Sequence, residues 1–222
     1  MIMNNISNIP QSLNETLINS NLTDVTIDAV EAEIDNYLEN GLLKDIPIVS
    51  SIVGVIKTTQ NISSYLLLKK IVAFLNGIKS IDPKKRQKMI TDIDNSDKYR
   101  IKVGEKLLYI IDRCNDHEKA EYIAMLFCGL VNEKINYFEF DSATHIVNNL
   151  PVILLKDFLL MPFEEIQTLP PHIAERYVHY GLYYMVTGMN IELFGKDMGK
   201  EKNNAKITHM GKIIHGILNF SK

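Results

Sequence analysis

The longest apolar stretch of the chain covers residues 42–78 and contains few charged side chains. Its spacing predicts one helix that begins at Pro47 and a second that runs from about Ser63 to Lys79. The polar link over 58–62 is compatible with one bent helix or with a helical hairpin. Because apolar residues cover most of the circumference of the first helix, it must be buried in a core, against a partner or against lipid.

We expect this hairpin to engage a protein partner, a second copy of the chain or a membrane. Small residues on one side of the first helix, Ser50, Ser51 and Gly54, would allow another helix to approach closely. The competing interpretation is that the hairpin forms the core of a helical bundle. The candidate contact residues are Ile48, Val49, Ile52, Val53, Gly54, Val55, Leu66, Leu67, Ile71 and Phe74.

Amphipathic patterns continue on both sides of the hairpin, and they predict a helical bundle over 23–150. Residues 1–22 are rich in Asn and read as a flexible N-terminus. Residues 24–40 carry a helical stripe of apolar side chains opposite acidic ones. Asp82 followed by Pro83 marks a helix start, and the helix over 84–93 begins with a basic cluster, which consists of Lys84, Lys85, Arg86 and Lys88.

The pattern changes after residue 150 and predicts a winged-helix-like subdomain over 151–222. Short helical segments lead to a helix at 172–182, then to β-forming residues, a Lys-rich turn and a short strand before a last helix that Thr208 can cap. The expected fold class is therefore mainly α, a helical bundle with a C-terminal winged-helix-like β-hairpin. In a nucleic-acid interpretation, the candidate phosphate and base contacts are Arg176, His179, Lys196, Lys200, Lys202 and Lys206.

Charge is distributed unevenly along the 222 residues, although the net charge is only -3. Acidic residues occur throughout the first 43 positions, whereas no Lys or Arg precedes Lys44. This acidic segment could fold back on the basic remainder, meet a basic partner, or simply form a solvated helix face.

The sequence contains no motif that specifies a reaction. Its six histidines and two cysteines lack metal-ligand spacing, and phosphate-loop, kinase and hydrolase motifs are absent. We therefore expect neither enzymatic activity nor a cofactor or metal. Without a signal-peptide pattern or a sufficiently long charge-free apolar run, we expect a cytoplasmic protein that can associate peripherally with the inner membrane.

Several packing patterns carry a resemblance to a known group of proteins. They read IPIVSSIVG, LLLKKIVAFLNGI, KRQK, VGEKLLYIIDR and EKAEYIAMLF, and the tail adds YGLYY and ITHMGK. Over roughly residues 46–150 the chain resembles small, functionally uncharacterised bacterial helical proteins associated with mobile-element and phage-defence neighbourhoods. The resemblance implies a non-enzymatic effector or interaction module in anti-phage defence, such as abortive infection, and carries over no site residues. A winged-helix DNA-binding regulator is the alternative function.

Overall fold

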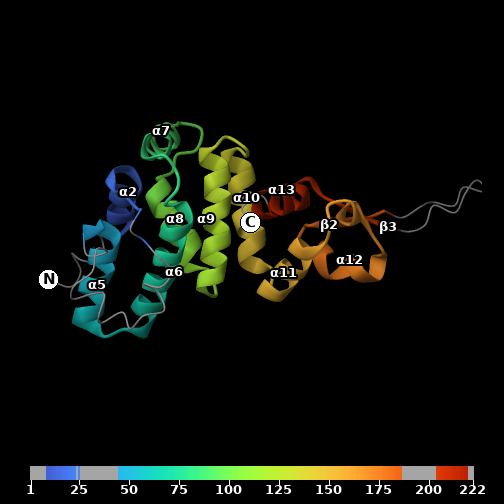
Figure 1. Ribbon diagram of the computed structural model, residues 1–222, viewed down its shortest axis with the longest axis horizontal. Coiled ribbons are helices and arrows are strands. Elements are labelled where there is room, and N and C mark those ends of the chain that lie inside the picture. Colours follow the sequence, from blue (N-terminus) through green and yellow to red (C-terminus); the bar gives the residue numbers. More distant parts are fainter. Residues whose placement is uncertain (1–8, 24, 26–44, 187–203, 220–222) are drawn as a thin grey trace, which may run out of the picture. The chain divides into compact units, whose positions relative to one another are not determined.

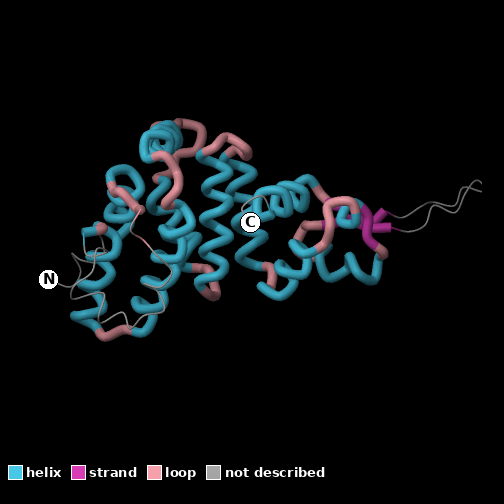
Figure 2. Tube along the Cα trace, viewed as in Figure 1, coloured by secondary structure: helices cyan, strands magenta, loops and turns pink. Residues whose placement is uncertain are grey.

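The computed structural model describes residues 9–23, 25, 45–186 and 204–219, and it divides into two compact units at Asn136 and Tyr137. Figures 1 and 2 show that helices dominate the described chain and that strands occur only near its C-terminal end. The predicted fold class, mainly α with a C-terminal β-hairpin, is confirmed. The first unit contains α2 (Ile9–Asn19), α5 (Pro47–Thr59), α6 (Ile62–Ile78), α7 (Pro83–Asp94), α8 (Val103–Asp112) and α9 (His117–Val131).

The centre of the first unit is the contact between α6 and α9. Phe74 and Phe127 pack with ring centroids 5.7 Å apart. One turn further along α6, a Cβ added at Gly77 would lie only 2.5 Å from the Cβ of Ala124. The two backbones therefore approach as closely as they do only because position 77 lacks a side chain.

Helices α5 and α6 form a hairpin rather than one bent helix. Gln60 ends α5 in the left-handed conformation with a φ of 49°, and its N–H donates to the carbonyl of Ile56. Asn61 then caps α6, because its side chain accepts a hydrogen bond from Ser63 N at 2.9 Å. This two-residue turn reverses the chain, so that the apolar faces of both helices contribute to one core.

The prediction of a flexible N-terminus is wrong for residues 9–19, which form α2. Leu13 and Leu17 are fully buried, and α2 packs against α5, α7 and α8. Polar contacts fix its register, because Ser12 and Ser51 share a hydrogen bond of 2.7 Å and Ile48 N donates to Thr16 Oγ1 at 3.1 Å. These tertiary contacts outweigh the Asn-rich local composition. The stripe predicted over 24–40 lies outside the described residues except for Val25.

The second unit begins earlier than residue 151, because α10 packs against α13 rather than ending the bundle. Its elements are α10 (Tyr137–Asn149), α11 (Val152–Leu160), a 3₁₀ turn (Glu165–Gln167), β1 (Thr168–Leu169), α12 (Pro171–Val178), β2 (Tyr183–Val186), β3 (Asn204–Ile207) and α13 (His209–Asn219).

The sheet of this unit is antiparallel with the strand order β1-β3-β2. Lys206 on β3 lies opposite Thr168 on one side and Tyr184 on the other. The predicted cap of the last helix is confirmed, because Thr208 Oγ1 accepts from Gly211 N at 3.0 Å and donates to the carbonyl of Gly181 at 2.7 Å. The expected hairpin thus gains a third strand, β1, which the sequence analysis missed.

Substituting Gly77 tests the α6–α9 crossing directly. We expect Gly77→Ala to destabilise the protein by about 1–3 kcal/mol, because the new Cβ forces the helices apart. The matched control is Gly54→Ala, since no described atom lies within 4 Å of a Cβ at Gly54. The control should be neutral or stabilise by up to about 1 kcal/mol through helix propensity. Urea denaturation measures the free energy of unfolding of both variants. Equal effects would contradict the close crossing of α6 and α9 at Gly77.

Candidate functional site

Most of the residues predicted to contact a partner or a membrane lie in the core. Helices α2, α8 and α9 pack against the α5–α6 hairpin, and this packing explains the difference from the sequence-based expectation. Val53, Gly54 and Leu67 are half-buried, and only Leu66 is exposed. The candidates that are buried, and so cannot contact a partner or a membrane in the folded state, are Ile48, Val49, Ile52, Val55, Ile71 and Phe74.

An outward-facing stripe remains on α6, and we call it the α6 stripe: Ile62, Tyr65, Leu66 and Lys69. Ile62 is 76% exposed and Leu66 is 53% exposed. Lys69 Nζ lies 5.3 Å from the centroid of the Tyr65 ring, so a cation covers one aromatic face. The spacing places all four side chains along one side of the helix. The sequence analysis identified only Leu66 of this group.

The basic cluster predicted on α7 contains one buried member. Arg86 is 1% exposed, and its guanidinium donates to the carbonyl of Leu17 and, at 2.9 Å, to that of Ser20. Burial lowers the pKa of Arg86. These carbonyls belong to the C-terminal end of α2, where the helix leaves acceptors unsatisfied and where its dipole favours a positive charge. Arg86 therefore holds α2 in place instead of joining the exposed lysines.

The junction between α8 and α9 contains further buried polar groups. Lys70 Nζ donates to the carbonyls of Asp112 and Cys114. Lys119 is 1% exposed, and burial lowers its pKa. Burial raises the pKa of the Cys114 thiol to about 12 and that of the Cys128 thiol to about 11. Both thiols are thus protonated at neutral pH and are poor nucleophiles.

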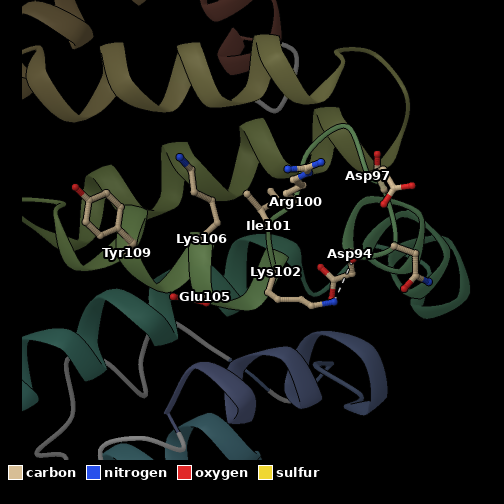
Figure 3. A pocket seen from close by; sticks show the side chains of 10 residues that line it. Asp94, Asp97, Arg100, Ile101, Lys102, Glu105, Lys106 and Tyr109 are labelled. Atoms are coloured by element: carbon tan, nitrogen blue, oxygen red, sulfur yellow. Dashed lines mark hydrogen bonds between the residues drawn. The ribbon is translucent and has the colours of Figure 1, made fainter.

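An open groove of about 620 Å³ lies between the end of α7 and the start of α8. Figure 3 shows acidic and basic side chains together along its walls. Asp94 is already engaged, since its carboxylate accepts from Val103 N at 2.7 Å and its carbonyl accepts from Lys102 Nζ at 3.1 Å. Charges of both signs give the groove no preference for an anion or a cation. Its lining consists of Asp94, Asn95, Ser96, Asp97, Arg100, Ile101, Lys102, Glu105, Lys106 and Tyr109.

The candidate nucleic-acid contacts are only partly brought together. Arg176 lies on α12 and pairs with Asp157 at 4.0 Å, while its guanidinium stacks 5.4 Å from the Tyr177 centroid. His179 is exposed just after α12, and Lys206 is exposed on β3. A single helix of eight residues separates β1 from β2. The remaining candidates, Lys196, Lys200 and Lys202, lie outside the described residues.

An aromatic cluster forms the interior of the second unit, and the sequence analysis missed it. Phe158 contacts Tyr177, Tyr183 and His215, with ring centroids between 5.5 and 6.2 Å apart. Tyr183 donates to the carbonyl of Ile166 at 2.7 Å, whereas the buried Tyr177 hydroxyl has no partner among the described residues. The cluster joins α11, α12, α13 and the sheet, and it acts as a core rather than as a pocket.

Comparison with protein-family models, with curated proteins and with solved structures found no match. Within the described chain, no helix has the length and apolarity needed to cross a membrane. The same residues contain no group of three His, Cys, Asp or Glu side chains that could hold a metal ion.

Replacing Arg86 tests its role as the anchor of α2. We expect Arg86→Met to destabilise the protein by about 2–3 kcal/mol, because two charge-assisted hydrogen bonds to carbonyls are lost. Removal of the desolvated charge offsets only part of this loss. The exposed Lys84→Met on the same helix should change stability by less than about 0.5 kcal/mol. Denaturant unfolding gives both values. A neutral Arg86→Met would show that α2 is held in place without this anchor.

Proposed function

We propose that the protein is a non-enzymatic interaction module whose α6 stripe binds a protein partner. One observation carries this proposal: the apolar hairpin buries its inner face and still presents Ile62 and Leu66 to solvent. Contact between water and large apolar side chains is unfavourable, so binding of a partner that covers them is favoured.

The arrangement of the stripe suits a particular mode of binding. Apolar positions at i, i+3 and i+4 followed by a cation at i+7 are typical of a helix that lies in an apolar groove of its partner. The methylene stem of Lys69 can extend the apolar surface while its ammonium group stays hydrated. We therefore expect the partner to offer an apolar groove with an acidic rim.

The biological role and the cellular location of this interaction are a separate proposal. The resemblance to proteins of phage-defence neighbourhoods supports a role in bacterial defence at a cytoplasmic location. A peripheral contact with the inner membrane is the competing use of the α6 stripe, because exposed apolar residues beside lysines also bind anionic lipid surfaces.

Site-specific photocrosslinking tests the proposed surface in cells. A photoreactive amino acid at position 62 or 66 should give a discrete protein adduct, whereas the same residue at position 153 or 160 should not. Ile153 and Leu160 are the matched controls, because they are apolar helical residues of the second unit with 66% and 74% exposure. No adduct at 62 and 66, or equal adducts at all four positions, would contradict the proposal.

Paired charge substitutions separate a protein partner from lipid. Ile62→Glu with Leu66→Glu should abolish the crosslink to position 65 and any protection in a phage plaque assay, while Ile153→Glu with Leu160→Glu should change neither. The exposed positions should tolerate the change within about 0.5 kcal/mol. Flotation with vesicles of anionic lipid identifies the membrane alternative, because binding that the stripe variant loses would assign the stripe to lipid.

DNA binding is a second candidate function, and the sheet order favours it. The β1-β3-β2 strand order and the position of α12 directly before the hairpin match a winged helix, although α12 is the only described helix between β1 and β2. Lys206 is exposed on β3. The paired Arg176 and the absence of Asn and Gln from α12 favour phosphate contacts over base readout.

This candidate predicts a salt-sensitive shift of duplex DNA with little sequence preference. Replacing Lys196, Lys200, Lys202 and Lys206 by Ala should weaken the shift strongly and reduce its dependence on salt. A control that replaces Lys57, Lys98, Lys134 and Lys156 changes the net charge equally and should retain the shift. Equal losses in both variants would show that DNA binding depends on net charge alone and would contradict a specific role of these four lysines.

A further inference from the structure

Helix α7 presents three lysines that nothing in the described structure neutralises. Lys84, Lys85 and Lys88 are exposed, and none of their ammonium groups has an ion pair or hydrogen bond with a described residue. They share one helix of 12 residues, and Arg86 between them points inward. Like charges at this spacing repel one another, so an anionic partner would be favourable.

The chain itself leaves the described region next to this helix. Val25 is fully buried, and its carbonyl accepts a hydrogen bond from Lys79 Nζ at 3.1 Å. Lys79 is the C-cap residue of α6 and lies three residues before Asp82, the N-cap of α7. The residues after Val25 therefore start at the N-terminal end of α7, where Lys84 and Lys85 lie, and the described chain resumes at Asp45 before α5.

The intervening sequence has the complementary charge. Residues 26–44 lie outside the described part of the chain, and no basic residue precedes Lys44. Asp28 can lie up to about 10 Å from Val25, and Glu31 up to about 20 Å, by the length of an extended chain. A helix of 12 residues is about 18 Å long. The acidic side chains can thus reach the whole of α7; they are Asp28, Glu31, Glu33, Asp35 and Glu39.

We propose that the lysine face of α7 is the docking surface for the acidic stretch 28–39 of the same chain. Each exposed ion pair is individually weak and is screened by salt, so the docking is reversible and depends on several pairs acting together. An external polyanion such as nucleic acid would compete for the same lysines. This inference does not depend on the α6 stripe or on DNA binding by the second unit.

Cleavage by a glutamyl endopeptidase provides the test, because the acidic stretch contains Glu31, Glu33 and Glu39. In about 50 mM salt, the full-length Lys84→Glu, Lys85→Glu, Lys88→Glu variant should be cut within this stretch about tenfold faster than the unmodified protein, since cleavage follows the undocked population. In about 500 mM salt the two rates should converge, because screening removes the docking in both proteins. Mass spectrometry identifies the cleavage sites.

Two further variants make the result decisive. The charge-matched control Lys57→Glu, Lys98→Glu, Lys134→Glu should be cut at the unmodified rate. Adding Asp28→Lys, Glu31→Lys and Asp35→Lys to the triple α7 variant exchanges the signs and should restore protection at Glu33 and Glu39. Thermal melts verify that all variants remain folded. Cleavage that the α7 variant leaves unchanged at low salt, or that the control accelerates equally, would overturn the proposal, even if the α7 lysines then bound heparin.

Discussion

The close crossing of α6 on α9 is the contact on which the first unit depends. At Gly77 and Ala124 the two helices meet with almost no side chain between them, while Phe74 and Phe127 fill the space one turn away. Helix α6 also packs against α5 and α8, so it has neighbours on several sides. The apolar residues on several of its sides are therefore chiefly a requirement of the core. The exposed apolar residues of α6 are confined to the narrow stripe near its N-terminal end.

Local signals in the sequence predicted where helices begin. Asp82 followed by Pro83, and Thr208 before the last helix, act through atoms only two or three residues away, and both caps are present. Helix α2 could not be predicted in the same way. Its Leu13 and Leu17 are one turn apart, but the helix is held by hydrogen bonds that join Ser12 to Ser51, Thr16 to Ile48 and Ser20 to Arg86. The second residue of each pair lies far along the chain. Composition describes only the local preference, and here distant partners decide.

The candidate surfaces were predictable only in outline for a related reason. An apolar pattern that surrounds a helix indicates burial without telling which residues face the core, so Leu66 was identified as a contact while Ile62 was not. Gly54 was expected to permit close approach, yet the helix pair that uses a glycine in this way does so at Gly77. Arg176 resembled a free phosphate contact until Asp157, which lies on a different helix, was seen beside it.

Several cations among the described residues of the first unit bond carbonyl groups. Arg86 bonds carbonyls at the end of α2, Lys70 bonds those after α8, Lys79 bonds Val25 and Lys102 bonds Asp94. A carbonyl satisfies the hydrogen bond of a cation but does not cancel its charge. Among the described residues of this unit, Lys and Arg outnumber Asp and Glu. In the docking that we propose, the acidic stretch 28–39 supplies negative charge to these residues from within the same chain.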